Sequence, residues 1–352
     1  MSGSSKMVSF TRDDTAWAKG IAILAMVFHH VCPSDCTTPI VLQGNIDALS
    51  VVAATCKACV PLFTILSGYG LAKGYNPDRQ VKCYDVRYVC VHLLQLYAMY
   101  WVVLVWAYAA IWLRGGGVLA FYGQGRGAVL NLVSDVFGMA LITKGPRLVG
   151  TWYITAIVIY YILTPLLIRL VRKFGLVAVL ALWTPWVYWR IFGYDTVDTD
   201  DTIYYVHAFA LGIYFAQTGI LQRWKSSQLL SAKLCSIGLL ALAVIVRMFA
   251  ALMADTLVAV AVLRVCTCFA DSGARFNDVL RFFGRHSANL WLIHAFLMFK
   301  VNLDARSAPA KYLIFLFICT CCSLGIEAAK DFVGFRTAVA ALRRRIMGNS
   351  SA

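Results

Sequence analysis

The stretch that decides the fold is WAKGIAILAMVFHH, residues 17–30, a long apolar run that carries three ionisable side chains. Lys19 lies near its start, and His29 and His30 lie at its end. The run is typical of a membrane-crossing helix, which needs about 20 mainly apolar residues. Ionisable groups in such a helix are costly and generally face a bundle interior or a wet cavity. These three residues are therefore candidate functional residues.

The rest of the chain is equally apolar. Of its 352 residues, 61% are hydrophobic and only 14% are charged, whereas about a quarter of the residues in a soluble domain are charged. One soluble core could not bury so much apolar surface, so the composition predicts an all-α, polytopic integral membrane protein. The polar start shows no cleavable signal peptide, and the first span is expected to stay in the mature protein.

The apolar runs predict about ten membrane-spanning helices. These spans are expected at residues 17–34, 48–73, 87–113, 151–171, 175–192, 203–219, 233–253, 256–272, 281–300 and 311–330. The stretch 128–142 is shorter and contains Asp135, so it is expected to be an interfacial or re-entrant helix. If it crosses the membrane, the count becomes eleven and the topology after it inverts.

The distribution of charge places both termini in the cytoplasm. Basic clusters follow the spans on that side, at 73–87, at 169–173 and in the RRR of residues 343–345, as the positive-inside rule requires. The same rule accounts for the net charge of +15, so the bilayer is the expected partner and nucleic acid is not. The loop 114–150 does not follow the positive-inside rule, because it is basic although it is expected on the outer side. Either its basic residues bind an anionic ligand there, or the topology differs from the one predicted.

Three regions are expected on this basis. They are a cytoplasmic segment at 1–16, a single transmembrane domain at 17–333 and a basic cytoplasmic tail at 334–352. The twelve cysteines lie mostly in apolar runs, where a thiol packs as a small apolar side chain, and neither a disulfide framework nor a metal site is expected. Cys32 and Cys36, in an expected outer loop, are an exception open to disulfide formation.

Helical geometry relates the three ionisable residues of the opening stretch. Lys19 and His30 are eleven residues apart, which is about three turns, so both face the same way about 16 Å apart. His29 points about a quarter-turn aside. Two other interpretations stay open, because Lys19 could extend to the headgroups and the histidines could lie at the interface.

Five motifs in order along the chain resemble the acyltransferase-3 family of integral-membrane O-acyltransferases, which modify envelope polysaccharides and related glycans. The first is the basic residue, ten residues and histidine of Lys19 to His30. The others are VPLFTILSGYGL at 60–71, TWYITAIVIYYILTPLL at 151–167, FFGRHSANLWLIHAFL at 282–297 and Glu327 in the last span. The resemblance therefore covers almost the whole chain.

The resemblance implies an O-acyltransferase that moves an acyl group, expected to be acetyl, from acyl-CoA to a hydroxyl of a cell-envelope polysaccharide or related glycan. His30 is the implied general base, because a hydroxyl is a poor nucleophile and imidazole titrates near neutral pH. Lys19 is implied to meet the CoA phosphates. Acetyl-CoA is then a co-substrate with no bound cofactor, and a multi-pass protein of a bacterial inner (plasma) membrane is implied.

The second span supplies three further candidates for substrate or donor binding, Ser67, Gly68 and Tyr69. Gly68 could let backbone approach the thioester or simply permit close helix packing. An acyl-enzyme on Ser67 is an alternative that ranks below direct transfer, and His29 could share the work of His30.

Three candidates come from later spans. Trp152 could stack on a sugar or adenine ring, or anchor its helix at the membrane interface. His294 could support the site or bond a neighbouring helix, and Glu327 is expected in a structural ion pair. Arg247 and Arg264, inside predicted spans, have no assigned role.

One departure from the family pattern concerns the third span. Many members carry Arg-x-x-Arg there, where this chain has His92 and Gln95. If the arginines of those members bind the phosphates of the donor, other residues of this chain must do so, and Arg87 and Lys82 are candidates. The acyl donor that this protein prefers is therefore open.

A different class of function stays open beside the enzyme. A transporter or flippase of a glycan or small anionic metabolite would also place ionisable groups inside a bundle. Such proteins often show paired structural repeats with broken helices, and the sequence shows no such pairing. An inactive relative of the acyltransferases is the other open alternative.

Overall fold

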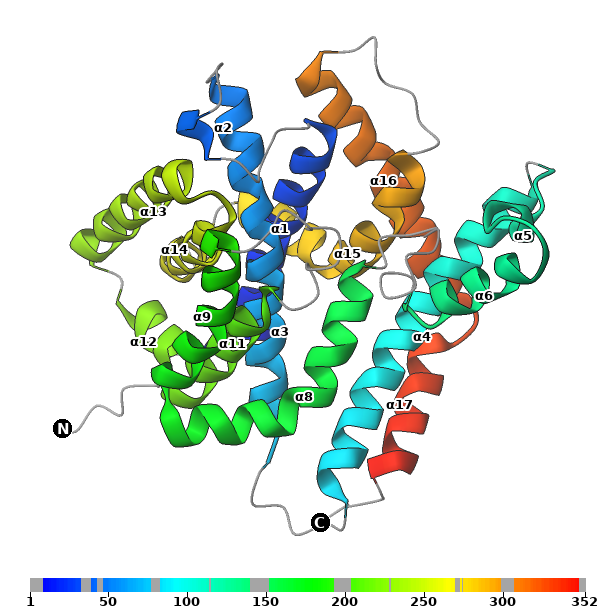
Figure 1. Cartoon of the computed structure of the whole chain (residues 1–352), viewed down its shortest axis with the longest axis horizontal. Coiled ribbons are helices and arrows are strands. Elements are labelled where there is room, and N and C mark those ends of the chain that lie inside the picture. The colour runs from blue at the N-terminus through cyan, green and yellow to red at the C-terminus, as the bar shows by residue number, and fades with distance from the viewer. Residues whose placement is uncertain are drawn as a thin grey trace. The chain divides into compact units, whose positions relative to one another are not determined.

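The computed structural model describes residues 9–32, 39–42, 47–76, 83–113, 115–139, 152–192, 204–227, 229–269, 273, 275–298 and 307–347. Every regular element among these residues is an α-helix or a short 3-10 helix, which confirms the all-α prediction (Figure 1). Some residues used in the sequence predictions lie outside the described ranges, namely Cys36, Lys82 and, in the loop 114–150, residues 114 and 140–150.

Five helical stretches in the described part of the chain are long and apolar enough to cross a membrane. They are Ala48–Gly74, Tyr84–Leu113, Trp152–Phe174, Leu230–Phe269 and Ala308–Phe332. The fourth contains two predicted spans, because the chain turns back within it. A shorter apolar helix, Leu176–Tyr188, matches the predicted span 175–192. The chain is thus a membrane protein, while the count of ten spans and the side of each terminus remain predictions.

Three predicted spans form helices that do not meet the length and hydropathy of a span. Two of them carry several charged residues and the third has only 13 residues; they are Arg12–Val31, Arg275–Met298 and Val206–Thr218. The helix found within 128–142 is Gly125–Val136, whose 12 residues are fewer than a crossing requires.

The chain forms two compact units. Unit 1 comprises Met1–Lys73, Ile168–Gly193 and Tyr205–Ser287, and unit 2 comprises Gly74–Leu167, Tyr194–Tyr204 and Ala288–Ala352. Two long helices, α8 (Trp152–Phe174) and α15 (Arg275–Met298), contribute residues to both units.

Unit 1 begins with α1, which covers the opening stretch as one unbroken helix. Its elements are α1 (Arg12–Val31), η1 (Ile40–Leu42), α2 (Ala48–Thr55), η2 (Cys56–Ala58), α3 (Cys59–Gly74), α9 (Leu176–Phe192), α11 (Val206–Thr218), α12 (Ile220–Ser226), α13 (Leu230–Ala250), η4 (Ala251–Ala254) and α14 (Asp255–Phe269). Thr11 and Asp14 cap α1 reciprocally, since each side chain accepts the backbone N–H of the other. The buried Asp14 carboxylate also pairs with Lys225 Nζ of α12 at 2.8 Å, which fixes the start of α1 against α12.

Glycines bring two helix pairs of unit 1 into backbone contact. A Cβ on Gly68 of α3 would lie 2.1 Å from the Phe209 carbonyl oxygen of α11, and one on Gly212 of α11 would lie 2.0 Å from the Ile65 oxygen of α3. The same holds between α1 and α15, where a Cβ on Gly284 would lie 1.7 Å from the Ala16 oxygen. Small residues permit this close approach of helices in membranes. Tight packing is therefore the structural reason for Gly68.

Helices α13 and α14 pack against each other as a hairpin joined by η4. The chain turns at Ala251, whose φ of 49° ends α13. On either side of this turn, Arg247 and Asp255 form a fully buried ion pair, with Arg247 Nε 3.1 Å from the carboxylate. Arg264 donates to the Trp224 carbonyl at 3.0 Å and lies over its ring. Both arginines without a predicted role thus have structural partners.

Unit 2 is built around the long helix α4. It contains α4 (Tyr84–Leu113), α5 (Val118–Phe121), α6 (Gly125–Val136), α16 (Ala308–Phe332) and α17 (Phe335–Met347), with the first part of α8 and the last part of α15. Figure 1 shows α17, in red, alongside α4, in cyan, and the two helices are in contact. The buried Asp135 of α6 accepts a hydrogen bond from Tyr122 at 2.7 Å. Burial and this carboxylate raise the pKa of Tyr122.

We expect Gly68→Ala to destabilise the protein, because its new methyl group would meet the backbone of α11. Overpacking of this kind costs about 1–3 kcal/mol, which lowers Tm by several degrees. Thermal unfolding of the purified protein in detergent measures the effect. Gly70→Ala is the matched control on α3, since its Cβ would have no atom within 4 Å. It should leave Tm unchanged or raise it, because Ala favours a helix over Gly. Equal Tm values for the two variants would contradict the close contact.

Candidate functional site

The opening stretch folds into α1 so that Lys19 and His30 share one face, as predicted. Both residues are half-buried. Among the described residues Lys19 has no hydrogen bond or ion pair, whereas the two other cations of unit 1 that lie deepest, Lys225 and Arg247, are paired. A half-buried ammonium that no described residue pairs with has donors for a ligand.

His29 lies on another face of α1, and a backbone contact orients it. Its Nδ1 is 2.9 Å from the Ala53 carbonyl oxygen of α2. A carbonyl oxygen only accepts, so Nδ1 carries the proton and Nε2 keeps its lone pair. The rings of His29 and His30 are 5.1 Å apart between centroids, so the pair forms one imidazole cluster at the end of α1.

The three candidates of the second span lie together on α3, and each has a structural partner. The Ser67 hydroxyl donates to the Phe63 carbonyl at 2.8 Å, an interaction common within helices. Gly68 contacts the backbone of α11. The Tyr69 hydroxyl accepts from Gln222 Nε2 at 2.9 Å. The structure thus gives this motif a packing role, and the roles in binding remain a prediction.

In unit 2, Trp291 connects two other candidates. Its ring centroid lies 6.2 Å from that of Trp152 and 6.4 Å from that of His294. Tyr153 also contacts it, at 4.9 Å. His294 is buried, and its Nδ1 lies 2.5 Å from the Trp291 carbonyl oxygen, so this histidine has the same tautomer as His29. Sequence reasoning missed Trp291 and Tyr153, although both lie within the quoted motifs.

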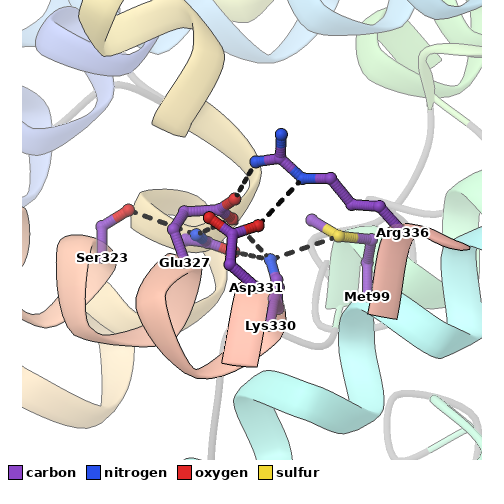
Figure 2. A network of polar contacts seen from close by, with 7 residues as sticks. Met99, Ser323, Glu327, Lys330, Asp331 and Arg336 are labelled. Carbon is purple, nitrogen blue, oxygen red and sulfur yellow. Dashed lines mark hydrogen bonds and ion pairs between the residues drawn. The ribbon is translucent and has the colours of Figure 1, made fainter. Parts of the chain in front are cut away.

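Glu327 belongs to the polar network shown in Figure 2. Its carboxylate accepts hydrogen bonds from Asn289 and Lys330, each at 2.8 Å, and from Arg336 at 2.7 Å. The ion pair expected for Glu327 is therefore present. The bond to Glu327 raises the pKa of the Arg336 guanidinium.

Lys330 is the buried centre of this network. Its Nζ also donates to the Asn289 amide oxygen at 2.7 Å and lies 3.3 Å from the sulfur of Met99 on α4 (Figure 2). The amide of Asn289 in turn bonds Ser323 at 3.3 Å. The network thus ties α16 to α15, α4 and the start of α17, which is a structural role for Glu327.

The third-span position that departs from the family pattern lies beside the C-terminal helix. His92 Nδ1 lies 2.8 Å from the Tyr88 carbonyl oxygen, and the two rings are 4.2 Å apart. Arg343 of α17 lies within electrostatic range of both residues. A cation is therefore present near this position, supplied from a segment about 250 residues later in the sequence. Nothing in the third span itself indicates this arginine.

The candidates thus fall into two groups. Lys19, His29, His30 and the α3 motif belong to unit 1, while Trp152, His294 and Glu327 belong to unit 2. Within each group the structure brings residues from different motifs together. The histidine pair has the chemistry of a base, and Lys19 that of an anion-binding group.

Comparison with known proteins adds the family. No curated protein and no solved structure matches the chain. A family model described as an acyltransferase domain, that of the acyltransferase-3 family, matches residues 15–328, which include all nine candidate residues. The chain therefore belongs to the acyltransferase-3 family.

Proposed function

We propose that the protein is a membrane O-acyltransferase that transfers an acyl group from acyl-CoA to a hydroxyl of a cell-envelope polysaccharide or related glycan. Membership of the family supports acyl transfer. The observation that carries the residue assignment is the continuity of α1, because one unbroken helix holds Lys19 and His30 on one face about 16 Å apart. This spacing fits a long donor molecule such as acyl-CoA. The base would lie at its reactive thioester and the cation at its phosphates. The proposed location is a bacterial inner membrane.

In the proposed reaction His30 acts as the general base. Its unprotonated ring nitrogen takes the proton of the acceptor hydroxyl while that oxygen attacks the thioester carbonyl carbon. The carbon–sulfur bond then breaks, and CoA leaves as a thiolate that takes up a proton. Acetyl-CoA is the first donor to test. Lys19 Nζ binds the CoA phosphates as a point charge, and the indole of Trp152 offers a stacking surface for a sugar or adenine ring.

Within unit 2, Arg343 and Arg87 are the candidates for binding an anionic group, the role that the resemblance implies for the arginines that many members carry in the third span. Arg343 lies near His92 and Tyr88, and Arg87 precedes Tyr88 in the chain. Guanidinium groups bind phosphate through paired hydrogen bonds.

The decisive experiment is thioester cleavage by the purified protein in liposomes. Labelled acetyl-CoA is supplied with crude envelope glycan, and release of free CoA is followed. We expect His30→Ala to lower the rate at least about a hundredfold, because a positioned base contributes about 10²–10⁴-fold. His286→Ala is the matched control, since this histidine packs on Phe282 and has no assigned role. It should keep the wild-type rate.

Other results would change the assignment. Equal rates for His30→Ala and wild type would remove His30 from the mechanism and direct attention to His29, Ser67 or His294. Thioester cleavage without acyl transfer to glycan would overturn the acceptor class alone. Failure of the wild type with a series of acyl-CoA donors would favour the transporter alternative.

We expect Arg343→Gln to raise KM for the CoA donor about tenfold with little change in kcat. A charge-assisted hydrogen bond is worth about 1.5–3 kcal/mol, and loss of contacts made equally in ground and transition states raises KM alone. Steady-state kinetics at varied donor concentration measures both constants. Arg345→Gln is the matched control, because residue 345 is about 200° around α17 from residue 343. Equal KM values for both variants and wild type would exclude Arg343 from donor binding.

A further inference from the structure

The C-terminal helix α17 supplies Arg343, yet the helix itself is weakly held. It has 13 residues, and none of them is buried. A helix of this length has marginal stability in water on its own, so the position of α17 depends on its contacts with α4 and α16. The family model ends at residue 328, so α17 lies outside the region to which the family assigns a role.

One set of contacts comes from an apolar face of α17. Phe335, Val339 and Ile346 are half-buried, and they lie within about 40° of one another around the helix. The helix packs against α4 (Figure 1), and Nζ of Lys330 on α16 lies 5.9 Å from the centre of the Phe335 ring. Three half-buried side chains contribute less to stability than fully buried ones, so this face alone holds α17 weakly.

A second set of contacts fixes the start of α17 to the end of α16. The guanidinium of Arg336 lies 2.7 Å from the carboxylate of Glu327 and 3.5 Å from that of Asp331 (Figure 2). Glu327 also accepts hydrogen bonds from Asn289 and Lys330, each at 2.8 Å. Arg336 therefore binds a carboxylate that other helices already hold in place.

Helical geometry connects Arg336 to Arg343. The two residues are seven positions apart, so they lie on the same face of α17, about 10 Å apart along its axis. Arg343 lies within electrostatic range of His92 and Tyr88 on α4. Because an α-helix turns as one body, a contact that fixes Arg336 also fixes the direction in which Arg343 points.

We propose that Arg336 is a positioning residue, whose ion pairs with Glu327 and Asp331 hold α17 so that Arg343 is directed toward the anionic donor. The inference rests on the proposed function, in which Arg343 binds an anionic group of acyl-CoA. Arg336 itself does not contact the donor. It acts by raising the fraction of molecules in which α17 is docked, and the apparent affinity for a ligand rises with the fraction of the protein that is competent to bind it.

Steady-state kinetics with the acyl-CoA donor tests this role. We expect Arg336→Gln to raise KM for the donor about threefold to fivefold and to leave kcat unchanged, because ion pairs with an exposed partner contribute modestly. Arg336→Lys keeps the charge and should restore most of the wild-type KM. The side chain of Arg336 is 71% exposed, so these variants should fold and keep the wild-type Tm.

Arg344→Gln is the matched control, since it removes the same charge from the same helix. Residue 344 lies about 180° around α17 from Phe335, and the variant should keep the wild-type KM. A KM raised equally by Arg344→Gln and Arg336→Gln would show an effect of net charge alone and would overturn the positioning role.

The double variant Arg336→Gln/Arg343→Gln separates positioning from direct binding. If Arg336 acts only through Arg343, its loss has no further effect once Arg343 is gone, so KM of the double variant should equal that of Arg343→Gln. Effects that multiply would mean that Arg336 acts on the donor independently of Arg343, which contradicts the proposal.

Hydrogen exchange in the full-length protein in detergent tests the docking of α17 without turnover. We expect the amides of residues 335–347 to exchange several-fold faster in Arg336→Gln than in wild type or Arg344→Gln, since docking protects them. Unchanged exchange would overturn the role of the ion pairs. Faster exchange with a wild-type KM would overturn positioning while Arg343 stays a donor residue. A wild-type KM for Arg343→Gln would overturn the donor role of Arg343, and the inference with it.

Discussion

The fold of unit 1 depends on helices that meet backbone to backbone. Helices in lipid gain little from burying apolar side chains, so close van der Waals contact must hold them together. Gly68 and Gly212 bring α3 against α11, and Gly284 brings α15 against α1. Trp17 of α1 adds a hydrogen bond to Asn277 of α15 at 2.8 Å. Because α1 carries the histidine pair, these contacts fix the position of the proposed base relative to the elements around it.

Charged side chains in these helices are neutralised by partners that the fold supplies. Lys225 reaches Asp14 in unit 1, and Lys330 reaches Glu327 in unit 2. An unpaired charge in such surroundings costs several kcal/mol, so each pair also specifies which helices lie together. Lys19 differs from these lysines, because no described residue pairs with it. The contrast is the structural reason for assigning Lys19 to a ligand.

The sequence predicted those features that depend on neighbouring residues. The apolar runs predicted the helices. The spacing of Lys19 and His30 within one helix predicted that both lie on the same face. The sequence could not predict contacts between distant segments. Asp14 and Lys225 are 211 residues apart, and Gly68 meets a carbonyl of α11 rather than a ligand. Arg343 likewise comes near His92 only once α17 has packed against α4. The helix α15 was predicted as a span, yet its charged residues keep it below the hydropathy of one.

The hairpin of α13 and α14 has a consequence for how the chain enters the membrane during synthesis. Arg247 lies in the last turn of α13 and Asp255 begins α14, so on a lone helix each would place an unpaired charge close to lipid during insertion, which is unfavourable. Only the four residues of η4 and a few flanking residues separate them, so the guanidinium meets its carboxylate as soon as the second helix follows the first. The two helices should therefore partition from the translocation channel into lipid together, with this ion pair already formed. A ribosome that stopped before Asp255 would leave α13 with its charge exposed and poorly retained in the bilayer.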